Sequence, residues 1–171
     1  MIYVARALAF GAGMAATLWP GSAPAGSDRG IAAFRSADYP TALEELAPAA
    51  TAGEPDAAFT LGQMYAAGLG VPKDPVRAVE LFRAAALRGH ADAQHSLGTA
   101  LFLGEGAGQD MAEGLKWVVI AGAAGLQKAR DYLEELRPVV TSELIAEARR
   151  RARDWRTPPS QSGEAGAPAG R

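Results

Sequence analysis

Residues 57–89 read AAFTLGQMYAAGLGVPKDPVRAVELFRAAALRG, and the same pattern returns over residues 93–125 after a shift of 36 positions. The matching positions are hydrophobic, glycine or aspartate residues: Leu61 with Leu97, Gly62 with Gly98, Asp74 with Asp110, and Gly89 with Gly125. A period between 20 and 50 residues is the sequence signature of a repeat protein. We therefore expect a stack of similar units that share their hydrophobic faces.

Each period is typical of two short helices. Apolar residues at helical spacing over 56–67 predict a first helix with one buried face, and Gly68 ends it because glycine accepts the left-handed conformation. Asp74 as N-cap and Pro75 at the first helical position predict a second helix, which ends at Gly89. The sequence thus predicts an all-α fold, an α–α superhelix of antiparallel helix pairs with a capping helix at its C-terminal end.

Glycines inside the predicted helices indicate tight packing. Gly62 and Gly98 hold equivalent positions, and an interior helical glycine costs about 1 kcal/mol relative to alanine. Its recurrence in register predicts a close approach of a neighbouring helix. In the second copy Asp110 and Glu113 predict a capping box. Leu101, Ala107 and Gly114 replace the tyrosine, the valine and the small alanine of the first copy, and we expect these changes to leave the fold intact and to loosen the second copy.

Residues 1–25 have the pattern of a secretory signal. A single charge, Arg6, precedes an apolar run over 7–19, and Ala23 and Ala25 form an A-x-A cleavage pattern. We expect cleavage near Ala25 and a periplasmic or secreted mature protein, with no membrane span once the signal is removed. An uncleaved anchor or a buried helix is the alternative.

The expected domain organisation follows from the repeat and the flanking composition. The boundaries are a signal peptide at 1–25, a helical solenoid at 26–156 and a tail at 157–171. The solenoid divides into a half-repeat at 29–56, repeats at 57–92 and 93–128, and a C-terminal cap at 129–156. The tail is rich in Pro, Gly and Ser, a composition typical of disorder.

Composition argues against several function classes. The 17 basic and 19 acidic residues give a net charge of −2, unlike the basic surface of nucleic-acid-binding proteins. The absence of cysteine excludes disulfides, a thiol nucleophile and cysteine-bound metals. The two histidines, His90 and His95, would point apart on a helix and do not predict a metal site. We expect no catalytic residues, no cofactor and no metal, and hence no enzyme.

The pattern A-x-x-x-L-G-x-x-Y-x-x-G-x-G-V-x-x-D over 57–74 resembles the Sel-one-like repeat, a relative of the tetratricopeptide repeat. The resemblance implies a right-handed superhelix with a concave binding surface. It also implies an adaptor, here an exported scaffold for a protein or peptide partner. The alternative is an auxiliary factor that binds cell-wall or exopolysaccharide carbohydrate in the envelope. Self-association stays open, because the stack is short.

The same resemblance indicates which residues face the partner. The first helix of each tetratricopeptide-like pair lines the concave side, and positions two before and two after the Leu-Gly leucine point into it. The partner-binding residues expected on this basis, with one aromatic added near the end of its helix, are Phe59, Gln63, His95, Thr99, Phe102, Asp131 and Glu135. Two interpretations stay open for Phe59 and Phe102, because exposed anchors and aromatics packed between helices share this spacing.

Overall fold

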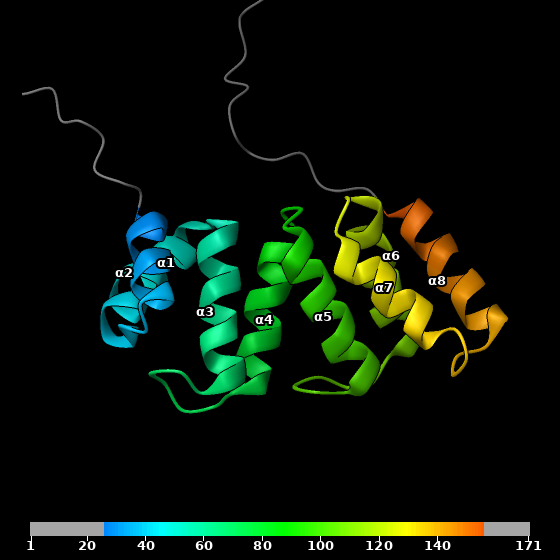
Figure 1. Cartoon of the computed structure of the whole chain (residues 1–171), viewed down its shortest axis with the longest axis horizontal. Helices are drawn as coiled ribbons and strands as arrows, with labels where there is room; N and C mark the ends of the chain where they lie inside the picture. Colours follow the sequence, from blue (N-terminus) through cyan, green and yellow to red (C-terminus); the bar gives the residue numbers. More distant parts are fainter. Residues whose placement is uncertain (1–25, 156–171) are drawn as a thin grey trace, which may run out of the picture.

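The computed structural model describes residues 26–155, which form eight α-helices and no strand (Figure 1). The helices are α1 (Gly26–Arg35), α2 (Tyr39–Ala52), α3 (Pro55–Ala67), α4 (Pro75–Ala86), α5 (Ala91–Leu103), α6 (Met111–Ala123), α7 (Gln127–Leu136) and α8 (Ser142–Asp154). The expected signal peptide and tail lie outside the described residues. No helix of the described range has the length and apolar character that a membrane crossing requires.

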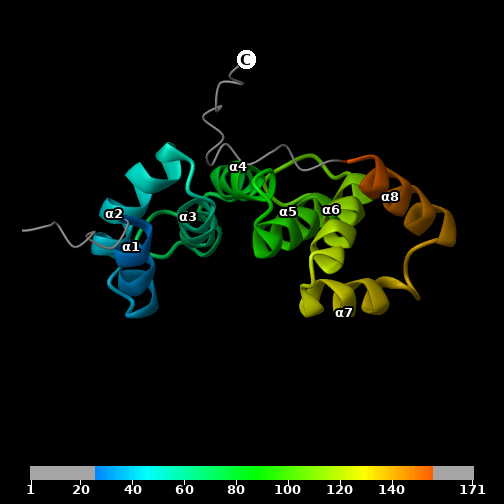
Figure 2. The ribbon, with the colours of Figure 1, turned by 90° about the horizontal axis from the view of Figure 1, so that it is seen from above.

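The helices pack as hairpins that stack in chain order. Helices α1 and α2, α3 and α4, and α5 and α6 form pairs, while α2 packs on α3 and α4 on α5. The stack curves into an arch in which α1 and α7 bend to the same side (Figure 2). We call this side the concave face and the opposite side, formed by α4 and its neighbours, the outer side. The predicted all-α superhelix is confirmed.

Aspartate caps start the second helix of each pair as predicted. Asp74 Oδ1 accepts a hydrogen bond from the Arg77 backbone N–H at 3.0 Å, and Asp110 Oδ1 accepts one from the Glu113 N–H at 2.9 Å. The expected capping box is wrong in one of its two hydrogen bonds, the one from the Asp110 backbone N–H to the Glu113 side chain. The Asp110 N–H donates to the Leu101 carbonyl, so Glu113 turns elsewhere and accepts from the Trp117 indole N–H at 3.1 Å.

Glycines set the distance between paired helices. A Cβ atom on Gly62 would lie 2.7 Å from the Phe82 ring, and one on Gly98 would lie 2.6 Å from the Gly114 carbonyl oxygen. Both close approaches expected from the repeat are therefore present. The expectation that Gly114 loosens the second copy is wrong, because a Cβ there would lie 2.6 Å from the Gly98 oxygen. The two glycines bring the backbones of α5 and α6 together.

The first helix pair is a full unit with a shortened connection. Gly30 faces Leu46 of α2 just as Gly62 faces Phe82 of α4. The spacing between Gly30 and Gly62 is 32 residues instead of 36, because a turn over 36–38 joins α1 directly to α2. Comparison at a fixed period of 36 therefore does not align α1 with α3 and α5.

The C-terminal cap departs from the regular stacking. Helix α8 packs mainly on α6, and α7 and α8 diverge from each other (Figure 2). Glu134 stands where the repeat has glycine, so α7 lacks the close-approach position of α3 and α5. The Trp155 ring meets Trp117 edge-on at 5.0 Å between centroids, and Arg151 lies 3.7 Å from a Glu113 carboxylate oxygen. These contacts hold the capping helix.

Candidate functional site

The concave face carries a hollow of about 620 Å³ where α1, α3 and the start of α5 meet. We call it the concave groove. Its lining combines three half-buried apolar side chains, those of Ile31, Phe34 and Phe59, with seven polar or charged residues. Gln63, one turn after Phe59 on α3, adds an amide to the lining. Two of the residues expected from the sequence, Phe59 and Gln63, thus lie in this groove.

Phe59 is wedged at the boundary between two helix pairs. Its ring centroid lies 4.5 Å from that of His90 and 5.9 Å from that of Phe82. The side chain is half-buried, so part of the ring still lines the groove. The ring therefore packs between helices and also lines the groove with its exposed part, and its role as an anchor for a partner stays a prediction.

His90 joins the second and third helix pairs. It is the N-cap of α5, and its Nδ1 accepts a hydrogen bond from the Ala93 backbone N–H at 3.1 Å. That bond places the ring proton of the neutral side chain on Nε2, which lies 3.1 Å from Asp56 Oδ1. His90 therefore donates to Asp56 and lies against Phe59. Sequence reasoning considered His90 only as a possible metal ligand, although its position directly before α5 is that of a cap.

Carboxylates dominate the charge around the groove. Asp28, Asp56 and Asp92 lie in the first turns of α1, α3 and α5, where the helix dipole favours negative charge. Among the lining residues one guanidinium, Arg35, opposes them. Asp92 also pairs with Lys128 of α7 at 2.5 Å, whereas the partner of Asp56 is the His90 imidazole. The groove therefore favours a cationic group over an anionic one.

The concave face continues between α5 and α7 as a packed aromatic contact. The rings of His95 and Tyr132 meet edge-on at 5.5 Å, and the Thr99 hydroxyl donates to the His95 carbonyl at 3.0 Å. Burial, together with the nearby Lys128 charge, lowers the pKa of His95. Burial also raises the pKa of Tyr132. His95 and Thr99 are half-buried and lie outside the concave groove.

The remaining expected residues do not line the groove. Phe102 is 8% exposed and packs in the core with Leu115 and Ala148, so the packed interpretation holds for this aromatic. Asp131 and Glu135 are exposed on α7. The Asp131 carboxylate accepts from the Gln127 amide at 2.8 Å, within its own helix. Within residues 26–155 no three His, Asp or Glu side chains are grouped to hold a metal ion.

Comparison with known proteins identifies the repeat. Residues 55–90 and 91–126 each match the family model of the Sel1 repeat. The chain is a Sel1-like repeat protein. Its two matched repeats have the period of 36 residues found in the sequence, and the Phe59 position lies in the first of them. The Sel1 repeat fold implies a scaffold for protein–protein interaction, and Sel1 repeat proteins are generally non-catalytic.

Two solved structures resemble this Sel1-like repeat protein. One is c5321 of uropathogenic Escherichia coli, a protective antigen displaying an SLR fold, with 28% identity and a TM-score of 0.68 over 78% of the present chain. The other is a Sel1 repeat protein from Oxalobacter formigenes, with 28% identity and a TM-score of 0.62 over 75%. The matches span 30% and 55% of those longer chains. None of the curated proteins matches the chain in sequence.

Several groove residues of this Sel1-like repeat protein escaped the sequence comparison. Ile31 and Phe34 belong to α1, which the four-residue shorter connection moves out of register. Aligning Gly30 with Gly62 would have placed Ile31 beside Gln63 as a groove position. Outside the groove, Tyr132 of the contact with His95 lies one position away from the expected Asp131, and the repeat pattern gave no signal for it.

Proposed function

We propose that this Sel1-like repeat protein binds an extended segment of a partner protein in the concave groove. The observation that carries the proposal is the hollow of about 620 Å³ across three helices, in which three apolar side chains lie among seven polar or charged ones. Placed polar groups of this kind fix the orientation of a bound ligand. The role is one of binding and not of catalysis.

The lining indicates the chemistry of the bound segment. Ile31, Phe34 and Phe59 offer contact to an apolar side chain. The Gln63 amide has both a donor and an acceptor, as a peptide backbone requires. Asp56 and its neighbours on the rim favour Lys or Arg. We therefore expect a partner segment with a hydrophobic residue close to a basic one.

The surroundings of Phe59 favour a peptide over a carbohydrate. Sugars commonly stack on an aromatic ring with an open face. The ring centroid of His90 lies 4.5 Å from that of Phe59, with the ring planes 32° apart. The Phe82 ring also lies beside Phe59, at 5.9 Å between centroids. These contacts leave Phe59 suited to an inserted apolar side chain. Envelope oligosaccharides are therefore the comparison ligands in the test.

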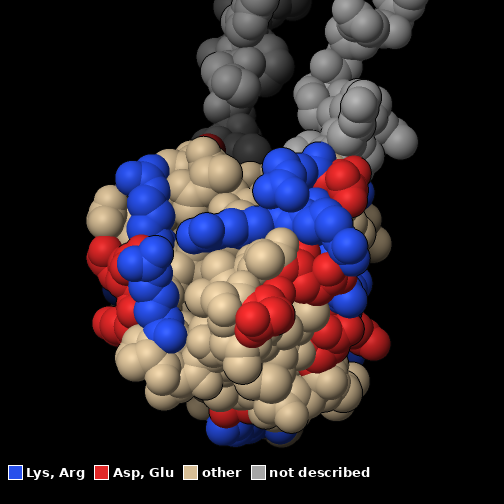
Figure 3. Space-filling model, turned by 90° about the vertical axis from the view of Figure 1, so that its right-hand side faces the viewer, with Lys and Arg blue, Asp and Glu red and all other residues tan. Residues whose placement is uncertain are grey.

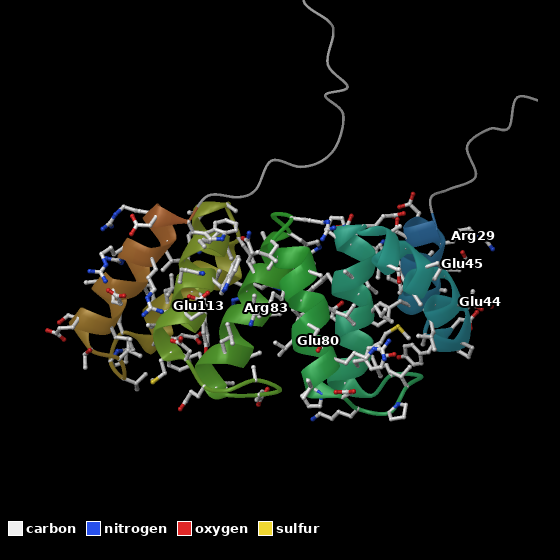
Figure 4. The ribbon with its side chains drawn as sticks, turned by 180° about the vertical axis from the view of Figure 1, so that it is seen from behind. Arg29, Glu44, Glu45, Glu80, Arg83 and Glu113 are labelled. Carbon is white, nitrogen blue, oxygen red and sulfur yellow. The ribbon has the colours of Figure 1, made fainter. Side chains whose placement is uncertain are left out.

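Site-specific photo-cross-linking tests the proposal. We would place p-benzoylphenylalanine at Gln63 in the groove and, as control, at the exposed Glu80 of α4 on the outer side (Figure 4). Irradiation in envelope extracts should give polypeptide adducts from position 63 that the control lacks. Asp56→Lys should weaken the yield, because it places a positive charge on the rim. Equal adducts from both positions, or binding of oligosaccharide alone, would contradict the proposal.

We also propose that the protein is exported through its N-terminal segment. The support is the sequence pattern of Arg6, the apolar run over 7–19 and the A-x-A motif that ends at Ala25. Expression of the full chain with a C-terminal tag in a Gram-negative host should yield periplasmic protein whose N-terminus follows Ala25. A chain without residues 2–25 should stay in the cytoplasm. Cytoplasmic retention of the full chain with its N-terminus intact would contradict export.

A further inference from the structure

A second hollow, of about 530 Å³, lies on the outer side at the C-terminal end of the stack. It runs between the second halves of α6 and α8, and we call it the end groove. Its walls are mainly apolar and partly exposed: Val119, Ile120 and Ala123 on α6, Ala152 on α8, and Trp155 after it. It lies on another face than the concave groove, it is formed by other helices, and its charged lining residues are arginines instead of mainly aspartates.

Two arginines flank the end groove without an ionic partner. Arg149 and Arg153 lie one turn apart on α8, line the groove, and form no ion pair within residues 26–155. The other two arginines of α8 are paired, since Arg150 and Arg151 contact the Glu147 carboxylate at 2.5 and 2.8 Å. Basic side chains gather over the upper part of this end beside uncharged surface (Figure 3).

We propose that the end groove binds an amphipathic helix of a partner protein whose polar edge carries Asp or Glu. A helix ridge fits the furrow between two packed helices, here α6 and α8. Its apolar side chains would face Ile120 and Trp155. Carboxylates one turn apart would meet Arg149 and Arg153, which have the same spacing. This site does not depend on the concave groove, and it selects the opposite charge.

The hollow shape decides against a lipid surface. Apolar residues, Trp and Arg also occur where proteins contact anionic membranes, but a bilayer offers no ridge to fill a concave site. The walls of the end groove come from two helices that flank a shallow furrow, with Trp155 beside Trp117. A helix supplies the protruding side chains that such walls accept.

Two synthetic helices provide the test with the full chain. Both carry the same leucine stripe, and the flanking positions hold Glu in one peptide and Gln in the other. We expect calorimetry to show the Glu peptide binding about tenfold more tightly. The double variant Arg149→Glu with Arg153→Glu should reverse this order. Arg150→Glu is the matched control, because Arg150 is already paired, and Phe59→Ala should leave the affinity unchanged if the site is separate from the concave groove.

Each alternative occupant has its own outcome. Equal affinity for the two peptides, or a preference that survives in the folded double variant, would overturn the proposal. Binding that appears only after deletion of residues 157–171 would assign the groove to the chain's own tail. Dimers that the double variant abolishes would assign it to a second copy. Displacement of the Glu peptide by phosphatidylglycerol vesicles, without an effect of neutral vesicles, would assign it to a membrane.

Discussion

Two glycines without side chains determine how closely α5 and α6 pack. A Cβ atom added to Gly98 would lie 2.6 Å from the Gly114 carbonyl oxygen, and one added to Gly114 would lie 2.6 Å from the Gly98 carbonyl oxygen. Backbone atoms cannot move aside as a flexible side chain can, so this contact tolerates no added methyl group. At Gly62 the neighbour is a ring instead, and that ring is itself buried.

Gly98→Ala should lower the free energy of unfolding by about 2 to 3 kcal/mol, because the added methyl group overpacks the contact between α5 and α6. Urea denaturation followed by circular dichroism measures the change. Gly108→Ala is the control, since no atom lies within 4 Å of its Cβ position. If both variants unfold at the same urea concentration, the glycine contact does not set the packing.

His95 should make stability depend on pH. Burial lowers the pKa of His95 below its ordinary value of 6.5, so the unfolded chain binds the proton more readily. The resulting contribution to stability is complete above about 6.5 and is lost as the pH falls through the folded-state pKa of His95.

The free energy of unfolding should therefore fall between pH 7.5 and pH 5.5, and less steeply in His95→Gln, which cannot titrate in this range. Both proteins keep every other titratable group, so the difference in slope isolates the His95 imidazole. Urea titrations at several pH values measure both slopes. Parallel slopes for the two proteins would show that His95 is equally solvated in the folded and unfolded chains.

At the scale of elements, α8 is joined to α6 by an aromatic pair, a charged contact and a buried apolar contact. The edge-on pair of Trp155 and Trp117 and the proximity of Arg151 to Glu113 join this helix to α6. Figure 4 shows Glu113 on the outer side, where α6 and α8 meet. Nearer the middle of the helix, Ala148 of α8 packs in the core with Phe102 and Leu115.

Trp155→Ala should release α8 locally and cost about 1 to 2 kcal/mol, the worth of a half-buried aromatic pair and its apolar contact. Hydrogen exchange should accelerate over residues 142–154 and stay unchanged in α3 and α4. Leu87→Ala on the exposed end of the second pair serves as control. Acceleration spread evenly over all helices would mean that the stack unfolds as one unit without a separate cap.

The sequence predicted the helices of the regular repeats because their signals are local. Asp74, Pro75 and Gly68 act on their own helix ends, and the apolar spacing acts within one helix. The site depended instead on how helices meet. His90, directly before α5 of the third pair, contacts Asp56 in α3 of the second pair. Ile31 lies on α1, and the connection from α1 to α2 is four residues shorter than in the other pairs. Such contacts follow from three-dimensional packing, which the fixed repeat shift did not capture.

At the scale of the whole molecule, the arch has two hollows of different character. The concave groove lies among inner helices with three aspartates in its lining. The end groove lies between outer helices, and its two arginines have no ionic partner in the described part of the chain. Opposite charges on separate faces would let one scaffold hold two partners without competition. Both surfaces depend on the stacking of hairpins, because each groove is formed by helices of different pairs.

Hydrogen exchange of the protein with and without the polypeptide captured through Gln63 tests the central claim most directly. Binding in the concave groove should protect α1, α3 and the first turn of α5, and leave α4 on the outer side unchanged. Protection confined to α4, or exchange unaltered by a polypeptide that is shown to be bound, would contradict a role for the concave groove.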